Sequence, residues 1–250
     1  MKTSNILRQL KGFAMAALMP FVLLNTSCNK EEVEPVNTHE DAYGDVLLKK
    51  MNMMGQDKYV PVFFAGGEDI VGGESTVTAP DGTVYPLNEF WAGPGILTAN
   101  GQVNNTFDFA GEYRFKLKFA DGYLKEVTDI LENTELDVPQ ISVNYDQAAQ
   151  TIEVSWTDVP GADLYCLKIT ELDMANTKPL FKKAQLPTNI TSYTIHIDGG
   201  DGWMRPVSDL QTGTEYWVVI AAKKVEQGKP VSGMSHDFQT SSCNKTKIVY

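Results

Sequence analysis

Apolar and polar residues alternate strictly along much of this chain after residue 59. The clearest run is Tyr113–Phe119, in which apolar side chains alternate with Arg114, Lys116 and Lys118. Successive side chains of a strand point to opposite faces, so this run predicts a strand with one face in a core. We expect the basic stripe on its other face to meet solvent; contact with an acidic polysaccharide is the alternative. No long helical periodicity follows residue 59, and the pattern therefore predicts an all-β protein.

Short predicted strands and turn residues also alternate between residues 59 and 137. Thr76–Ala79 and Thr83–Leu87 are separated by Pro-Asp-Gly, which predicts a hairpin. A strand around Pro61 suits a sheet edge better than a sheet centre. Strands at such regular spacing are typical of an antiparallel sandwich. The Gly-Glu-Tyr sequence at residue 111 resembles the start of the penultimate strand of an immunoglobulin-like domain, which implies that fold for residues 59–137.

The second half carries more specific residues. Trp156 ends an alternating strand, a Gly-Ala-x-x-Tyr sequence leads into the next strand at Tyr165, and a Leu-x-x-Gly-Thr-x-Tyr corner ends at Tyr216. Their order and spacing closely resemble a fibronectin type III domain. The corner has a physical reason, because a tyrosine there buries its ring while its hydroxyl bonds to backbone upstream.

The predicted fold is therefore all-β, with two tandem antiparallel β-sandwiches. An immunoglobulin-like sandwich covers residues 59–137, and a fibronectin type III domain covers residues 138–241. The resemblance implies a last strand at Ser232–Phe238, which leaves residues 242–250 as a C-terminal tail. One inserted loop, Asp198–Asp209, is longer and richer in glycine than the usual connection.

The first 27 residues have the composition of an export signal. A basic start precedes an apolar run over Phe13–Leu24, which is shorter than the ~20 residues that span a bilayer. A small residue then precedes Cys28. This order resembles a bacterial lipoprotein signal peptide covering residues 1–27, which implies that Cys28 begins the mature chain and carries acyl groups that anchor it in the membrane.

The residues after Cys28 add a second signal. Lys30, Glu31 and Glu32 resemble the export tag of Bacteroidota surface lipoproteins, which implies an outer-membrane protein exposed at the cell surface; a solvated charged linker is the alternative. Residues 28–58 are expected to form a tether. Leu47, Met51 and Met54 share one helical face and predict a short helix within it, ended by Gly55.

Charge excludes one class of partner. The chain has 21 basic and 32 acidic residues, a formal charge of −11. Cleavage before Cys28 would remove three basic and no acidic residues, so the mature chain would be more acidic still. This balance argues against a broad electrostatic grip on nucleic acid.

No catalytic group or cofactor site emerges from the sequence. His39, His196 and His236 lie in different segments, and the three cysteines are not clustered. Asp198–Gly202 is acidic and flexible but lacks the ligand order of a calcium loop, so we expect a surface turn there and no metal. The sequence predicts no enzyme, no metal site and no cofactor.

Three tryptophans are the candidate ligand-binding residues. Trp203 follows the glycines of the inserted loop and either stacks on a ligand or folds back on the sandwich. Trp217 should point away from the core together with Val219, toward the first domain or toward a partner. Trp91 lies in a loop of the first domain with the same two alternatives.

Cys166 and Cys243 would be free of each other, because the sixth strand of the implied domain separates the third strand from a residue beyond the last one. The predicted function is a non-enzymatic, lipid-anchored protein that binds a glycan or protein ligand through loop aromatics. The alternatives are a structural spacer or assembly subunit of an envelope complex, and an accessory glycan-capture lipoprotein of a polysaccharide-uptake system.

Overall fold

A computed structural model describes residues 39–53, 55–172, 178–231 and 237–250. The predicted signal peptide, Cys28 and the charged tag lie outside these residues. The described chain consists of strands and one 3-10 turn, η1 (Val207–Asp209), which confirms the all-β prediction. None of its segments is a helix long and apolar enough to cross a membrane.

The first sandwich packs two sheets against each other. One contains β1 (Tyr43–Met53), β2 (Gln56–Gly66), β6 (Ile96–Asn100) and β5 (Asn88–Glu89) in that order. The other contains β4 (Val84–Pro86), β3 (Thr76–Thr78), β7 (Gly111–Lys118) and β8 (Leu124–Leu131). Val46, Phe63, Val77 and Phe115 are fully buried between them.

The alternating strand forms as its pattern predicted. Tyr113 and Phe115 face the core from β7, whereas Arg114 and Lys116 are exposed. Tyr113 is further fixed by its hydroxyl, which donates to the backbone oxygen of Phe109 at 2.9 Å. The predicted hairpin is also confirmed by the antiparallel pairing of β3 with β4.

The predicted tether and its helix are wrong from Tyr43 onward. β1 pairs with β2 over its whole length, through a turn at Gly55, which has a positive φ of 80°. The sequence Val46–Leu48 has no alternation because both faces of β1 are buried, and a short apolar run does not distinguish a strand from a buried helix.

Pro61 also lies in a central strand and not at an edge. It pairs with Leu48 of β1, while on the other side β6 ends at Asn100, the partner of Val62. The oxygen of Pro61 accepts a bond from Gly101 N at 2.8 Å on that side. Because N and O of a strand residue point the same way, the missing N–H faces the end of β6 and removes no bond to β1.

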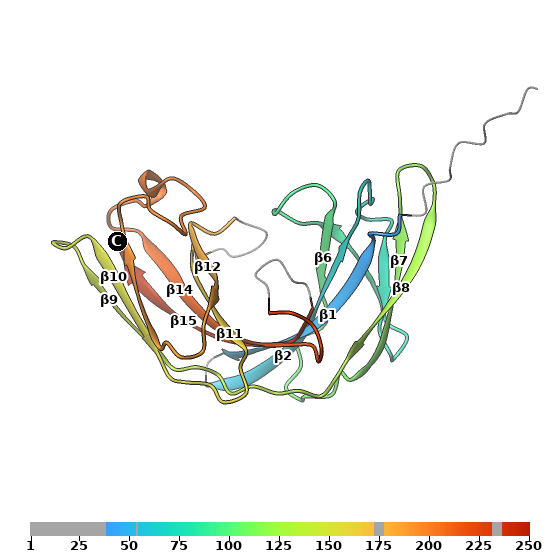
Figure 1. Ribbon diagram of the computed structural model, residues 1–250, viewed down its shortest axis with the longest axis horizontal. Coiled ribbons are helices and arrows are strands. Elements are labelled where there is room, and N and C mark those ends of the chain that lie inside the picture. The colour runs from blue at the N-terminus through green and yellow to red at the C-terminus, as the bar shows by residue number, and fades with distance from the viewer. Residues whose placement is uncertain (1–38, 54, 173–177, 232–236) are drawn as a thin grey trace, which may run out of the picture. The chain divides into compact units, whose positions relative to one another are not determined.

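The second sandwich packs three strands against four. β13 (Ser192–His196), β10 (Thr151–Trp156) and β9 (Ile141–Asp146) form one sheet. β12 (Phe181–Leu186), β11 (Leu164–Thr170), β14 (Glu215–Val225) and β15 (Phe238–Val249) face it. Figure 1 shows β9 and β10 layered against β14 and β15. This three-on-four order is that of a fibronectin type III fold.

The two aromatic residues that carried the resemblance are buried in this core. Trp156 contacts Tyr165, with ring centroids 5.5 Å apart. The hydroxyl of Tyr216 accepts a bond from Gln211 N at 2.8 Å and donates to Asp209 O at 3.4 Å. The tyrosine corner is therefore present as expected.

The last strand lies later than predicted. β15 begins at Phe238, so residues 242–249 belong to the sheet and the expected tail is wrong. The run Thr240–Ser242 is polar yet buried, and Thr240 Oγ1 donates to Leu48 O at 3.0 Å. The same strand pairs in parallel with β1, so one eight-stranded sheet runs through both sandwiches.

Cys166 and Cys243 are free thiols, buried on the sheet face opposite the second core. They share one row with Ala221 between them. Two strand spacings separate their Cα atoms by roughly 10 Å, beyond the ~7 Å that a disulfide allows. Cys243 lies within the last strand and not beyond it, yet the intervening strand keeps the two thiols apart.

Candidate functional site

Trp203 folds back on the second sandwich. Its side chain is half-buried, its indole Nε1 donates to His196 O at 3.0 Å, and its ring meets Phe181 edge-on at 5.4 Å. A backbone bridge between Phe181 and Trp203 holds the loop at this place. These contacts match the alternative in which the indole covers the core.

Trp91 is half-buried in the loop between β5 and β6. Its ring lies 5.0 Å from that of Phe90, which in turn meets Phe64 at 5.7 Å. The three candidate tryptophans thus come from different parts of the fold, and the structure does not bring them into one site.

Trp217 lies on a different kind of surface. On β14 it points away from the core, between Thr170 of β11 and Lys247 of β15. The Nζ atoms of Lys245 and Lys247 lie 4.3 Å and 5.4 Å from the centre of its ring. Cations over the face of an indole are attracted by its electron density.

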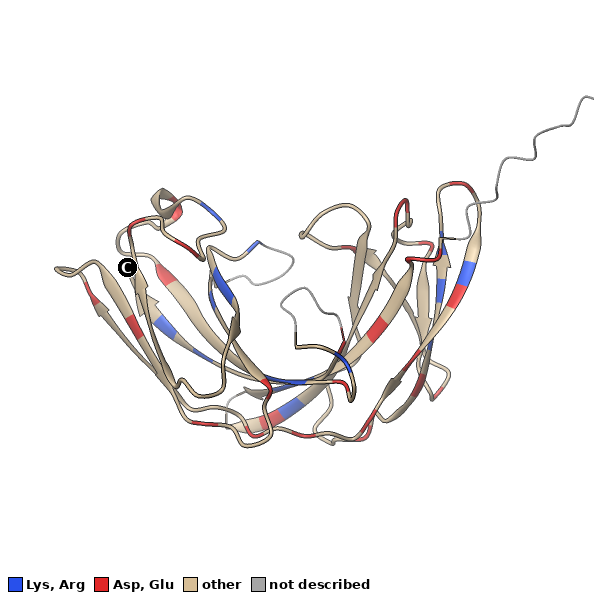
Figure 2. Ribbon diagram, viewed as in Figure 1, with Lys and Arg blue, Asp and Glu red and all other residues tan. Residues whose placement is uncertain are grey.

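These two lysines belong to a larger set on the same sheet face, which we call the lysine face. Strand pairing aligns Lys182, Lys168, Val219 and Lys245 in one row across β12, β11, β14 and β15. Figure 2 shows basic residues on β12 and on neighbouring strands of this sheet. The lysine face comprises Lys168, Lys182, Lys223, Lys245 and Lys247, of which the last two lie next to the Trp217 ring.

Four of these lysines have no carboxylate partner in the part of the chain that the structure describes. Lys247 pairs with Glu215 at 2.8 Å, whereas the other four make no ion pair with any residue that the structure describes. Burial lowers the pKa of Lys182, and the charge of Lys168 lowers it further. Burial also lowers the pKa of Lys223 to about 8, and both neighbours add to the effect. An anion bound here would relieve this repulsion.

The other basic stripe is more exposed, and one of its three residues has a carboxylate partner among the described residues. Arg114 Nε pairs with Glu112 at 2.7 Å, whereas Lys118 Nζ donates to Gly122 O at 2.9 Å. The acidic glycine loop is likewise satisfied internally. Asp198 Oδ1 accepts a bond from Gly200 N at 2.9 Å, and Asp201 pairs with Lys183. Both segments have the geometry of surface features.

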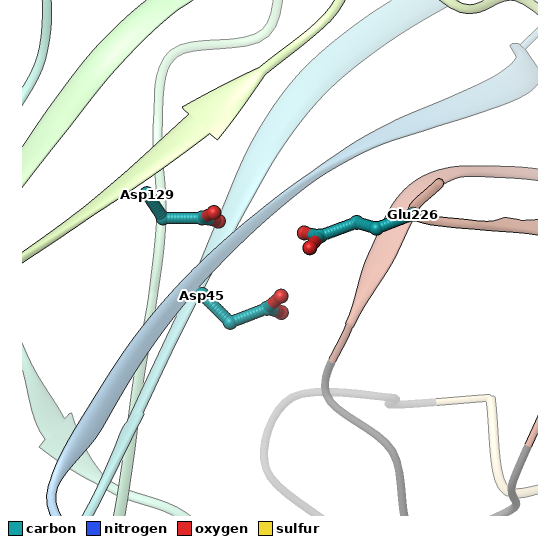
Figure 3. A group of neighbouring side chains, drawn as sticks. All are labelled: Asp45, Asp129 and Glu226. Carbon is teal, nitrogen blue, oxygen red and sulfur yellow. The ribbon is translucent and has the colours of Figure 1, made fainter. Parts of the chain in front are cut away.

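A group of three carboxylates was missed by sequence reasoning. Asp45 on β1, Asp129 on β8 and Glu226 after β14 each place one oxygen within 4.8 Å of the others. Figure 3 shows the three side chains pointing toward one another. They are more than 80 residues apart in pairs, so no local motif indicated them.

The backbone holds one of the three carboxylates. Asp129 Oδ2 accepts a bond from Val46 N at 2.7 Å, and its Oδ1 accepts one from Ile130 N at 2.8 Å. Asp45 Oδ2 and Glu226 Oε1, by contrast, are buried without a hydrogen-bond partner. The carboxylate of Asp129 is therefore fixed by the backbone, while Asp45 and Glu226 each place an oxygen without a hydrogen-bond partner near it.

This convergence disfavours ionisation of the three groups. Burial, together with the charges of Asp129 and Glu226, raises the pKa of Asp45 to about 9. Burial and the charges of Asp129 and Asp237 raise the pKa of Glu226 to about 7. Burial also raises the pKa of Asp129 against the effect of its backbone bonds. A cleft of about 420 Å³, lined by polar residues that include Glu226 and Gln239, adjoins the group.

The fold thus defines an all-β protein whose second sandwich is of the fibronectin type III kind. No family model matches the sequence, and no curated protein sequence is similar to it. Similar solved structures include a two-domain fibronectin type III segment of chicken tenascin, with 15% identity, a TM-score of 0.30, and 82% of this chain and 99% of that chain covered.

Two further structures have similar values. The FN1–FN3 domains of chicken CNTN1 share 12% identity at a TM-score of 0.30, over 82% of this chain and 62% of that one. A cytokine receptor complex shares 12% identity at a TM-score of 0.27, over 83% and 96%. No catalytic family is indicated. The assignment of the second sandwich rests on its strand order and buried aromatic residues.

Proposed function

We propose that this chain is a non-enzymatic, lipid-anchored cell-surface protein that binds an acidic glycan on its lysine face. One observation carries the proposal: five lysines share one sheet face with Trp217 in a chain of net charge −11, and four of them have no carboxylate partner among the described residues. Charges left unpaired in this way suit a ligand that supplies the anions.

The chemistry of the face favours a sugar acid. A uronic acid or sulfated sugar combines an anionic group with an apolar ring face, which matches lysine next to tryptophan. Trp217 is the platform for the ring, and Lys168, Lys182 and Lys245 are the partners of the anions. Because the rest of the chain is acidic, the attraction acts at short range and weakens with salt.

The N-terminal sequence supports the location. Cys28 follows a short apolar run and a small residue, and Lys30, Glu31 and Glu32 follow it. In this proposal Cys28 carries the acyl chains in the outer membrane, and the acidic tag directs the protein to the outer surface. A glycan-binding lipoprotein at that place would suit an adhesion protein or an accessory subunit of polysaccharide uptake.

The eight-stranded sheet favours a second candidate function. The parallel pairing of β1 with β15 makes both sandwiches share a backbone ladder, which limits their relative motion. A stiff two-domain body suits a spacer or assembly subunit of an envelope complex. A spacer would not need the unpaired lysines.

Binding to de-esterified polygalacturonate, measured by calorimetry, tests the proposal. Replacement of Lys168, Lys182 and Lys245 by Gln should weaken binding about tenfold, because three charge pairs at about 0.5 kcal/mol each correspond to that factor. The matched control replaces Arg114, Lys116 and Lys118 by Gln, which removes equal charge from the first sandwich and should change affinity less than about twofold.

Two outcomes would count against the glycan. Equal losses in both triple variants would show that net charge alone attracts the polymer. No binding to polygalacturonate or to a sulfated glycan by the unaltered protein would refute the proposal and favour the spacer. Neutral dextran serves as the control for sugar stacking without charge.

A further inference from the structure

The geometry points to a calcium-binding site formed by Asp45, Asp129 and Glu226 where the two sandwiches meet. This site is separate from the lysine face and does not depend on the proposed function. Its three ligands come from β1, from β8 and from the segment after β14.

The spacing of the three carboxylates fits one ion. Ca²⁺ binds oxygen at about 2.3–2.6 Å, so two oxygens on opposite sides of one ion lie roughly 4.6–5.2 Å apart. The ligand oxygens of this group lie within 4.8 Å of one another. One ion between them therefore needs only small rotations of side chains. An all-oxygen set also suits a hard cation and not the softer metals that prefer sulfur or imidazole.

Asp45 gives the independent reason to expect a ligand. Asp45 is only 4% exposed, and its Oδ2 has no hydrogen-bond partner among the described residues. Figure 3 shows that carboxylate directed at the space between the other two. Glu226 Oε1 enters the same space and is also buried without a partner. Buried ionised carboxylates are strongly disfavoured unless a cation or donor meets them.

The described residues place no cation in an ion pair with these carboxylates. The two lysines whose charges act on them have other contacts: Lys229 pairs with Asp237 at 2.9 Å, and the Nζ of Lys223 lies 4.0 Å from the ring centre of Phe238. Neither forms an ion pair with the three carboxylates among the described residues. The polar cleft beside Glu226 offers a route for an ion and for the waters that would complete its shell.

A bound ion would fasten the two sandwiches together. Asp45 and Asp129 come from the two different sheets of the first sandwich, whereas Glu226 follows the strand that pairs with β15 in the second. Calcium modules at the weak end of the known range have dissociation constants of about 10⁻⁴–10⁻³ M, which is the range to be tested here.

Calcium titration of the purified, EDTA-treated protein tests this inference. At 10 mM CaCl₂, about 100-fold above a dissociation constant near 10⁻⁴ M, the melting temperature should rise by about 5–10 °C, and calorimetry should show one site per chain. The same concentration of MgCl₂ should give a much smaller rise, because Mg²⁺ demands shorter bonds.

Asp45→Asn and Glu226→Gln should each abolish the calcium-dependent rise. In EDTA, Asp45→Asn should melt at or above the temperature of the unaltered protein, because it removes a buried carboxyl group that is disfavoured beside two others; this readout separates loss of binding from loss of folding. Glu226→Gln alters a half-buried segment and gives the same test with less risk to the core.

The matched control is Asp198→Asn with Asp201→Asn in the acidic glycine loop, which should leave the calcium response unchanged. The site would be refuted if the unaltered protein showed neither a heat of calcium binding nor a rise in melting temperature. It would also be refuted if Asp45→Asn kept the calcium-dependent rise. An equal shift with Mg²⁺ would overturn its assignment to calcium.

Discussion

The hydroxyl of Tyr216 offers the sharpest test of how the second sandwich is held together. Tyr216→Phe keeps the buried ring and removes only the oxygen that accepts the Gln211 N–H at 2.8 Å and donates to Asp209 O at 3.4 Å. The shorter bond dominates, because the second is at the limit of hydrogen-bond geometry.

The expected loss follows from these two bonds. A neutral hydrogen bond contributes about 1 kcal/mol net, and a backbone N–H left without a partner adds to the cost of its removal. We therefore expect Tyr216→Phe to lower the free energy of unfolding by about 2 kcal/mol. For a protein of this size that corresponds to a fall of about 4–8 °C in melting temperature.

Urea denaturation followed by tryptophan fluorescence measures the change, since Trp156 lies in the same core. The control is Tyr123→Phe, whose ring is 36% exposed and whose hydroxyl bonds to no residue in the described part of the chain. It should stay within about 0.5 kcal/mol of the unaltered protein. Equal stability of the two variants would refute the role given to the corner.

Two other positions give direct tests of packing and charge. Gly44→Ala should destabilise the first sandwich by about 1–3 kcal/mol in urea denaturation, since its Cβ would lie 2.4 Å from a buried aromatic ring; unchanged stability would contradict that close approach. Glu135 bonds to Lys50 at 2.6 Å, and this bond lowers the pKa of Glu135 below its usual 4.5. A pKa that is lower in the folded state than in the unfolded state means that the ionised carboxylate stabilises the fold. This stabilisation is fully present above the unfolded-state pKa and is lost as the pH falls through the folded-state pKa. The stability difference between the unaltered protein and Glu135→Gln should therefore be largest near pH 7 and narrow below about pH 4.5, and a difference independent of pH would contradict the ion pair.

Local patterns predicted the strands that have one buried and one solvated face. The alternation in β7 and the spacing of Trp156 and Tyr216 are properties of short segments, and both survive in the structure. The lysine face was only partly foreseen: Trp217 and Val219 were expected to point outward, but strand pairing alone reveals which lysines surround them.

The remaining features depend on contacts between distant segments. β1 is buried on both faces and so shows no alternation, while Thr240–Ser242 is polar but hidden by its pairing with β1. In the sequence, no local pattern distinguishes Asp45 and Glu226 from other acidic residues, and only the folded chain brings their carboxylates together. No single stretch of sequence contains these relationships.

The parallel pairing of β1 with β15 also means that the fold cannot be completed before the last strand has been synthesised. The hydrogen bond between Thr240 and Leu48 spans 192 residues, so a nascent chain carries β1 with one open edge until β15 has been synthesised. Such distant contacts slow folding, and open edges invite association between chains. A shortened product that stops before Phe238 would leave one edge of β1 and one edge of β14 unpaired, and we expect it to aggregate and not to yield a smaller functional protein.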